Sequence, residues 1–180
     1  MPRRPGDLER NDEVYDRIAA WSPEGAETIP PPFHIPSDEE RRPRTAEQMA
    51  AEALWYHAAA ADTADPLPSE PFRFGRFNLD ASQIFFATEL CVATVNLKPL
   101  CPGHVLVIPR RCVATLAELT AEEARELWHA VRQVQVIVMG CHGASACKLG
   151  VQDGRDAGQS VPHVHVHLLP CGAQAASTAT

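Results

Sequence analysis

The segment PHVHVHLLP, residues 162–170, constrains the fold more than any other part of the chain. Three histidines at alternate positions, His163, His165 and His167, are separated in it by Val164 and Val166. Successive side chains of an extended strand point to opposite faces. The pattern therefore predicts a strand whose three imidazoles share one face, while its aliphatic side chains pack into a core on the other.

A row of imidazoles suits several kinds of chemistry, because imidazole can act as a nucleophile, a proton carrier or a metal ligand. Alternate residues of a strand lie roughly 6.5–7 Å apart, a span that fits a phosphate group with a central attacking nitrogen and flanking donors. A zinc site is the main competing interpretation. However, no Cys-x-x-Cys motif occurs, and no cysteine or carboxylate stands at matching spacing beside the histidines. A surface strand without chemistry is the third interpretation.

Two upstream segments carry residues suited to phosphate and nucleotide binding. The loop GVQDGRDAGQS contains turn-forming glycines, and it has neutral hydrogen-bond donors at Gln152, Gln159 and Ser160. Glycine lets a backbone approach a ligand closely. Asn96 and His104 flank a second loop that leads into an apolar strand. Together with the histidines, these segments favour phosphate chemistry over metal binding.

The pattern of apolar residues predicts an α+β fold. Strands are expected at 84–86, 91–95, 105–108 and near 145–150, and a helix is expected to begin at Thr120. Thr120 and Glu123 form a capping box. Apolar residues then recur at helical spacing up to Val138 and include Trp128, which is expected in the core. The predicted architecture is a sheet with a helix packed on one face.

The chain resembles the histidine triad superfamily. Its signature alternates three histidines with apolar residues and ends in two apolar residues, and His163–Leu169 fits without exception. The region from Phe72 to Pro170 further resembles the fragile histidine triad branch through FRFG, ATELCVATVNLKPLCPGHVLVIP, VQDGRDAGQS and the triad. His167 argues against the nucleotidyltransferase branch, which has glutamine at the third position. The resemblance implies the histidine triad fold, an antiparallel sheet with a long helix on one face.

The resemblance also implies an activity, the hydrolysis of dinucleoside polyphosphates such as diadenosine triphosphate to AMP and ADP. His165 matches the nucleophile that carries a transient nucleotidyl group, and His163 matches a residue that supports its orientation. His167 matches a phosphate contact, and His104 matches a supporting histidine. The positions that match substrate-binding residues are Phe74, Phe77, Leu79, Asn96, Leu106, Gln152, Gly158, Gln159, Ser160, Val161 and His167.

The implied partners are the dinucleotide substrate and a second copy of the chain in a homodimer. No tightly bound cofactor is implied, and the resemblance is compatible with a divalent cation, Mg²⁺ or Mn²⁺, that binds together with the substrate. Two alternatives stay open. One is a nucleoside phosphoramidate hydrolase, and the other is a nucleotide-binding signalling protein with little turnover.

Charge and composition limit the classes of partner. The net charge is −7, of which residues 1–71 carry −8 (7 basic, 15 acidic) and residues 72–180 carry +1 (9 basic, 8 acidic). A nucleic-acid-binding surface would be visibly basic. No apolar run approaches the roughly 18 residues that span a bilayer, no membrane association is expected, and the six scattered cysteines indicate reduced thiols. A cytoplasmic location is therefore expected.

The chain is expected to divide into an acidic helical segment, 1–70, and a histidine triad catalytic domain, 71–178. Thr45 and Gln48 form a capping box, which predicts a helix over 46–60. In the family that the chain resembles, a tail with Pro-Arg…Gly-Asp, Arg-Asn-Asp…Tyr and an alanine-rich helix follows the histidine strand. Similar segments stand here ahead of the catalytic domain, which predicts a circular permutation with Pro2–Ile18 near the end of that strand. Tyr15 matches a tail tyrosine that is phosphorylated in the family; an unrelated helical appendage is the alternative.

Overall fold

The computed structural model describes residues 41–60 and 65–172. Within these residues the larger sheet is antiparallel and has five strands. In spatial order they are β3 (Ile84–Ala87), β4 (Cys91–Val95), β5 (Val105–Pro109), β7 (Val166–Cys171) and β6 (Ala146–Val151). A separate hairpin joins β1 (Phe72–Phe74) to β2 (Phe77–Leu79).

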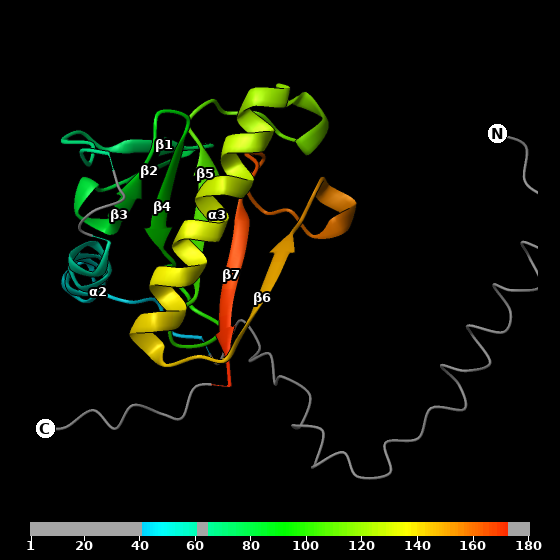
Figure 1. Ribbon diagram of the computed structural model, residues 1–180. Coiled ribbons are helices and arrows are strands. Elements are labelled where there is room, and N and C mark those ends of the chain that lie inside the picture. Colours follow the sequence, from blue (N-terminus) through cyan, green and yellow to red (C-terminus); the bar gives the residue numbers. More distant parts are fainter. Residues whose placement is uncertain (1–40, 61–64, 173–180) are drawn as a thin grey trace, which may run out of the picture. The chain divides into compact units, whose positions relative to one another are not determined.

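The long helix α3 (Ala121–His142) lies across one face of the five-stranded sheet, as Figure 1 shows. An α+β fold with an antiparallel sheet and a long helix on one face is therefore confirmed. No helix of the described residues is both long and apolar enough to cross a bilayer.

Alternating residues of the central strands divide the interior into two apolar clusters. On β5, Val105 and Val107 pack into the cluster that contains the buried residues of α3, while Leu106 and Ile108 pack with Phe74 of the hairpin. Strand β7 sends Val166 and Leu168 into the α3 cluster. The histidines that alternate with them therefore lie on the hairpin side of the sheet, away from α3.

Helix α3 begins where the sequence predicts. The hydroxyl of Thr120 accepts a hydrogen bond from the Glu123 backbone N–H at 3.2 Å, and the Glu123 carboxylate accepts one from the Thr120 N–H at 2.8 Å. The helix ends at Gly143, whose φ of +59° is the left-handed conformation common at helix C-termini.

The prediction that Trp128 lies in the core is wrong, because Trp128 is 47% exposed. The buried stripe of α3 includes Leu127, Val131, Val134 and Val138. These positions follow the helical repeat, whereas Trp128 is turned about 100° out of the stripe from Leu127. Its apolar character alone therefore did not place it inside.

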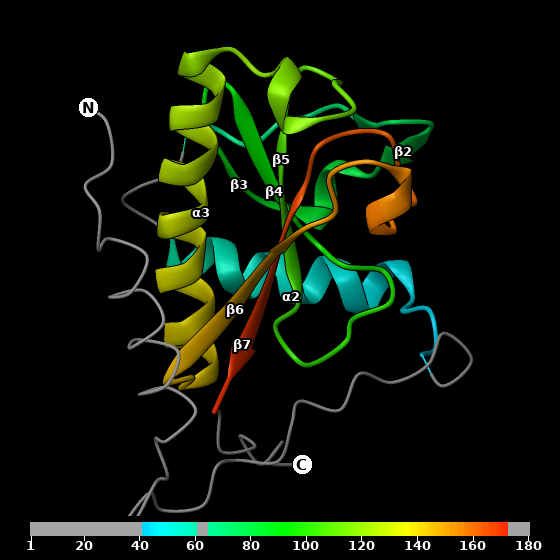
Figure 2. The same ribbon diagram turned by 90° about the vertical axis from the view of Figure 1, so that its right-hand side faces the viewer.

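The segment ahead of the hairpin contains helix α2 (Ala46–Ala59), which confirms the helix expected over 46–60. It is seen end-on in Figure 1 and runs crosswise to α3 in Figure 2. Met49, Ala53 and Tyr56 of α2 belong to the same buried cluster as α3 and the sheet. Helix α2 is thus part of the compact unit that holds the sheet, although it falls within the predicted 1–70 segment. Pro2–Ile18 and Tyr15 lie outside the described residues.

The strand predicted over the whole histidine segment begins later than expected. Pairing of β7 with β5 starts at Val166, which lies opposite Val107. Residues 161–163 bend, and the Val164 N–H donates to the Val113 carbonyl at 2.8 Å rather than to a strand partner. His163 and His165 therefore precede the strand, and only His167 lies in it.

Candidate active site

A cavity of about 600 Å³ opens on the hairpin side of the sheet. Its volume lies within the range of small-molecule sites. Its walls come from the hairpin, strands β4 and β5, the histidine segment and helix α2. The lining residues are Met49, Phe74, Phe77, Asn78, Leu79, Gln83, Thr94, Val95, Asn96, Leu97, Lys98, Leu106, Ser160, Val161, His165 and His167.

His165 has one ring nitrogen held and the other available. Its Nδ1 lies 2.8 Å from the His163 backbone carbonyl, which can only accept, so Nδ1 carries the proton. The lone pair of the neutral ring is then on Nε2. Burial lowers the pKa of His165, which keeps the ring neutral at pH 7. A neutral imidazole with a fixed tautomer and a free Nε2 can act as a nucleophile.

His163 uses both of its ring nitrogens inside the protein. Nε2 donates to the Pro109 carbonyl at 2.8 Å, and Nδ1 accepts from the Gly75 backbone N–H at 3.2 Å. The side chain is fully buried and does not line the cavity. The three triad imidazoles therefore do not converge on one point, as a shared zinc ligand set would. Among residues 41–60 and 65–172, no group of three or more His, Cys, Asp or Glu side chains is placed to hold a metal ion.

His104 and His167 form a second fixed pair. The Leu100 N–H donates to Nδ1 of His104 at 3.0 Å, so His104 carries its proton on Nε2 and donates it to Nδ1 of His167 at 2.9 Å. His167 is left with Nε2–H as a donor. Burial lowers the pKa of His104 to about 3 and that of His167 to about 4, and the nearness of other imidazoles adds to both shifts. Both rings are neutral at pH 7.

The loop after β4 joins this pair to the cavity. The Asn96 side-chain nitrogen lies 3.4 Å from Nδ1 of His104, the ring nitrogen that accepts, and Asn96 Oδ1 accepts from the Lys98 backbone N–H at 3.1 Å. Asn96 and Lys98 both line the cavity, and Lys98 is its cationic residue among the described lining. No described lining residue is acidic. The site therefore combines neutral imidazoles, three side-chain amides and one cation, which suits a compact anion.

The cavity brings together most of the residues predicted to bind substrate. Those that line it are Phe74, Phe77, Leu79, Asn96, Leu106, Ser160, Val161 and His167. The predicted nucleophile, His165, lines it as well. His104 and His163 lie behind the lining, and their predicted supporting roles are compatible with those places. Their roles in catalysis stay predictions.

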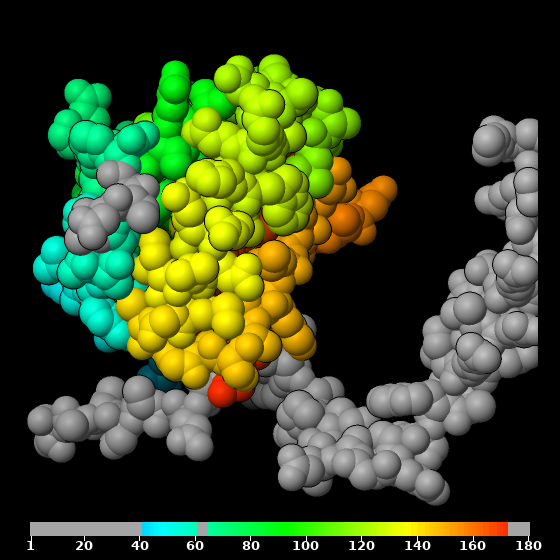
Figure 3. Space-filling view, viewed as in Figure 1, coloured from blue at the N-terminus to red at the C-terminus, as the bar shows by residue number. Residues whose placement is uncertain are grey.

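Three predicted substrate residues lie in the loop that carries the 3-10 turn η3 (Arg155–Ala157), outside the lining. This orange loop stands out from the body of the molecule in Figure 3. The Gln159 side chain donates to the Ala114 carbonyl at 2.8 Å. The Gln152 amide would lie 2.8 Å from a Cβ at Gly158. The predicted contacts of these residues with substrate stay predictions.

Sequence reasoning missed several lining residues, namely Met49, Asn78, Gln83, Thr94, Val95, Leu97 and Lys98. Strand alternation could have found Thr94, since Val92 and Thr94 share the face opposite Cys91 and Ala93. No local signal marks Met49, because it comes from a helix far ahead of the triad in the sequence.

Comparison with known proteins agrees with this geometry. The model of the HIT domain family matches residues 79–173. The chain is 53% identical over 97 residues to a bis(5'-nucleosyl)-tetraphosphatase [asymmetrical] of Schizosaccharomyces pombe, covering 54% of this chain and 53% of that protein. It is 48% identical over 99 residues to the bifunctional bis(5'-adenosyl)-triphosphatase/adenylylsulfatase FHIT of Arabidopsis thaliana, covering 55% of each. The chain thus spans about half the length of these curated relatives.

A solved structure gives the same result. The nitrilase and fragile histidine triad fusion protein of Caenorhabditis elegans, NitFhit, aligns with a TM-score of 0.57 at 42% identity, covering 62% of this chain and 27% of that one. The family match, the relatives and the triad geometry together show that the chain belongs to the HIT family, in its fragile histidine triad branch.

Proposed function

We propose that this protein is a dinucleoside polyphosphate hydrolase that forms a nucleotidyl-histidine on His165. The observation that carries the proposal is the fixed tautomer of His165, with Nδ1–H on the His163 carbonyl and Nε2 free in a residue that lines the cavity. The relatives named as bis(5'-nucleosyl)-tetraphosphatase and bis(5'-adenosyl)-triphosphatase support the substrate class.

In the first step the Nε2 lone pair of His165 attacks the α-phosphorus, and the bond from that phosphorus to the bridging oxygen breaks. With diadenosine triphosphate the leaving group is ADP, which departs with the electron pair of the broken bond. The imidazole becomes a cation that keeps its Nδ1–H, and the His163 carbonyl stabilises it. The Nε2–H of His167 is suited to donate to a phosphate oxygen as negative charge develops there.

In the second step water attacks the same phosphorus and the bond to Nε2 breaks. AMP leaves, His165 returns to its neutral form, and the proton lost by the water goes to solvent. The proposal leaves a divalent cation, Mg²⁺ or Mn²⁺, to be held by the substrate phosphates, since no described lining residue is a carboxylate.

Turnover of three substrates tests the proposal, namely diadenosine triphosphate, diadenosine tetraphosphate and adenosine phosphoramidate. We expect the dinucleotides to be cleaved with kcat/KM well above that for the phosphoramidate. His165→Ala should reduce kcat by about 10⁴-fold or more, as loss of a covalent nucleophile does, and it should abolish the adenylyl adduct seen by mass spectrometry after rapid quenching. His129→Ala, on the exposed face of α3, is the matched control.

The other outcomes select the alternatives. Faster cleavage of the phosphoramidate would identify a phosphoramidate hydrolase. Tight binding of all three compounds with negligible turnover would identify a nucleotide-binding signalling protein.

We also propose a homodimer that forms through β6. Among the described residues β6 pairs only with β7, and Leu149 on β6 is 43% exposed. The opposite edge strand, β3, is covered by other parts of the chain. His57 contacts the Phe85 carbonyl, and the Asp65 N–H donates to the Ala87 carbonyl. An edge strand can pair with a strand of a second chain. Sedimentation of the wild-type protein should give twice the chain mass of 19.6 kDa, and the Leu149→Asp variant should sediment as a monomer. A monomeric wild type would contradict the proposal.

We further propose that the order of segments is permuted relative to the family. The Arg41 guanidinium donates to the Lys98 carbonyl at 3.4 Å, and the Cys101 thiol contacts the Pro170 carbonyl at 3.8 Å. The start of the α2 segment and the end of β7 thus reach the same loop, which supports a connection between them. A chain with residues 1–64 placed after Gly172 should fold and bind AMP like the original order. Failure to fold would contradict the permutation.

A cytoplasmic location is proposed on the state of the cysteines. All six are free thiols, which fits a reducing compartment. Localisation of the tagged chain in its own cells tests this proposal.

A further inference from the structure

Helix α2 contributes one residue to the lining of the cavity. Met49, from the first turns of α2, lies among the lining residues, although more than a hundred residues separate it from the triad. Loop residues Asn96, Leu97 and Lys98 form the adjoining part of the lining. The contact between these two segments therefore shapes the cavity.

Three consecutive backbone carbonyls of this loop accept hydrogen bonds from two arginines. Arg44 donates from Nε to the Asn96 carbonyl at 3.0 Å, and its Nη2 donates to the same oxygen. The backbone N–H of Arg44 donates to the Leu97 carbonyl at 3.0 Å, and Arg41 donates to the Lys98 carbonyl at 3.4 Å. Within the loop the Asn96 N–H donates to the His104 carbonyl at 3.3 Å and the Lys98 N–H donates to Asn96 Oδ1 at 3.1 Å. The arginines add support from outside the loop, at the carbonyls of the same residues.

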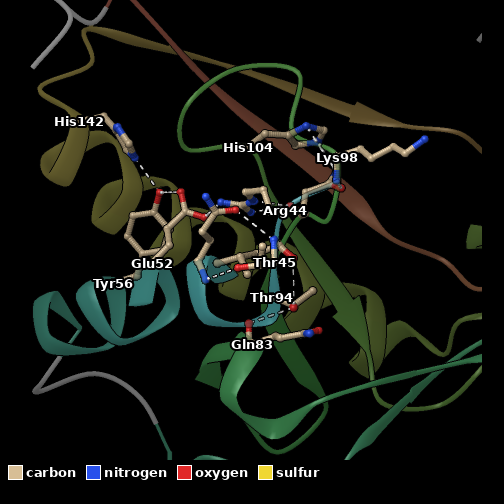
Figure 4. Close-up of polar contacts among 12 residues, drawn as sticks. Arg44, Thr45, Glu52, Tyr56, Gln83, Thr94, Lys98, His104 and His142 are labelled. Atoms are coloured by element: carbon tan, nitrogen blue, oxygen red, sulfur yellow. Dashed lines mark hydrogen bonds and ion pairs between the residues drawn. The ribbon is translucent and has the colours of Figure 1, made fainter. Parts of the chain in front are cut away.

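Arg44 is itself held in place. Its Nη1 forms an ion pair with Glu52, in the second turn of α2, and Glu52 accepts a hydrogen bond from the Tyr56 hydroxyl at 2.9 Å. Figure 4 shows Arg44 lying between Glu52 and Tyr56 on one side and the loop that carries Lys98 and His104 on the other. The planar guanidinium has five N–H donors in a rigid fork, so it can satisfy the carboxylate and the Asn96 carbonyl at once.

We infer that Arg44 is a positioning residue for substrate binding, which fixes the Asn96–Lys98 wall of the nucleotide cavity from helix α2. The inference deepens the proposed function and rests on it. His165 is oriented by the His163 carbonyl, which lies outside this loop. Loss of the Arg44 contacts is therefore expected to weaken nucleotide binding more than the chemical step.

The test compares Arg44→Lys with two controls in the full chain. Lysine keeps the positive charge beside Glu52 but cannot reproduce the fork. Arg42→Lys makes the same change at an exposed residue two positions earlier. Gln48→Ala removes a capping contact of α2, the 3.0 Å hydrogen bond from the Thr45 N–H, without touching the loop. It therefore reports what general loosening of the helix would do.

Arg44→Lys is expected to raise KM for diadenosine triphosphate and the dissociation constant for AMP about tenfold, while kcat changes less than about threefold. Amide hydrogen exchange of residues 97–100 should become faster in the same variant. Both controls should keep wild-type values of all these quantities. If Arg44→Lys shows no cooperative unfolding transition, and so is not properly folded, Arg41→Lys replaces it. In that variant KM and the dissociation constant for AMP are expected to rise about two- to threefold.

Calorimetric AMP binding separates this inference from the proposed function. A wild type that binds AMP but cleaves no dinucleotide would defeat the proposed function, while the tenfold change in AMP affinity would still support positioning. Unchanged KM and AMP affinity in Arg44→Lys would overturn the inference. An equal rise of KM and of the AMP dissociation constant in Gln48→Ala would overturn it too, since loosening of α2 would then explain the effect. A wild type that binds neither AMP nor diadenosine triphosphate would also overturn it.

Discussion

The backbone carbonyl of His163 lies 2.8 Å from Nδ1 of His165, and this contact determines which nitrogen of His165 can react. The side chain of His163 is meanwhile held by the Gly75 N–H and the Pro109 carbonyl. Anchoring one histidine through its ring thus places its carbonyl for the next. His163 and His165 occupy equivalent positions in the alternating sequence motif, but His163 is a structural support and His165 faces the cavity.

The pH dependence of kcat/KM should reflect the pKa of His165. In the proposed mechanism the neutral ring is the nucleophile, so protonation of His165 would stop the reaction. Burial lowers the pKa of His165 from its ordinary value of 6.5. We therefore expect activity to be constant from pH 8 to below pH 6.5 and to fall only at more acidic pH. Initial rates at substrate concentrations far below KM measure this profile. An acid limb with its midpoint at or above 6.5 would show that the ring is not desolvated in the free enzyme.

Replacing Gly75 by alanine should impair both stability and activity. Gly75 has a φ of +55°, and a Cβ there would lie 2.7 Å from Cγ1 of Val161, a lining residue. The left-handed conformation alone costs a residue with a Cβ about 1–2 kcal/mol, and the clash adds to it. Denaturant unfolding should show a loss of at least that size. The value of kcat/KM should fall as well, because a shifted backbone at residue 75 would displace the N–H that holds Nδ1 of His163.

The matched substitution is Gly140→Ala in α3. Gly140 is exposed, has no positive φ, and a Cβ there would meet no atom within 4 Å. Alanine should raise the free energy of unfolding by about 0.5–1 kcal/mol, because glycine is a poor helix residue. A similar loss at both positions would contradict the role given to Gly75.

The carboxylate of Glu123 should stabilise the fold only above acidic pH. Arg111 donates to both of its oxygens at 2.6 Å, and these hydrogen bonds lower the Glu123 pKa from 4.5 to about 2. A lowered folded-state pKa contributes stability that is complete above pH 4.5 and disappears as pH falls toward 2. The free energy of unfolding of Glu123→Gln should thus lie below that of wild type at pH 7, and the gap should close between pH 4.5 and 2. A gap that is independent of pH would refute this assignment.

Local signals predicted much of this fold. The capping boxes at Thr45 and Thr120 depend on residues three apart, and both helices begin where these signals lie. The alternation of the triad likewise predicted that Val164, Val166 and Leu168 enter the core. Such patterns report contacts within one turn or along one segment, which is why they can be read without the rest of the molecule.

Contacts between distant segments were beyond the sequence. Val164 pairs with Val113 instead of extending the strand, and Trp128 is exposed because neighbouring positions already fill the interface of α3. Met49 reaches the cavity only because α2 packs against β3 and β4 of the sheet. For Val164 and Met49 the deciding partner lies far along the chain, and no periodicity records it. Trp128 instead lies outside the helical stripe that Leu127 and Val131 belong to.

Replacing Tyr56 by phenylalanine should destabilise the junction between α2 and α3. The buried Tyr56 hydroxyl donates to Glu52 at 2.9 Å and, since it has one proton, accepts from Nε2 of His142 at 2.6 Å. Burial raises the pKa of this hydroxyl and lowers that of His142, so both groups stay neutral at pH 7. Phenylalanine would leave the carboxylate and the imidazole each without this partner in a part-buried site, at a cost of about 1–3 kcal/mol. Thermal and denaturant unfolding measure this cost.

Leu54→Ala on the exposed face of the same helix, where Leu54 is 69% exposed, should change stability by less than about 0.5 kcal/mol. If the two variants were equally stable, the hydroxyl would contribute nothing to holding α2 against α3.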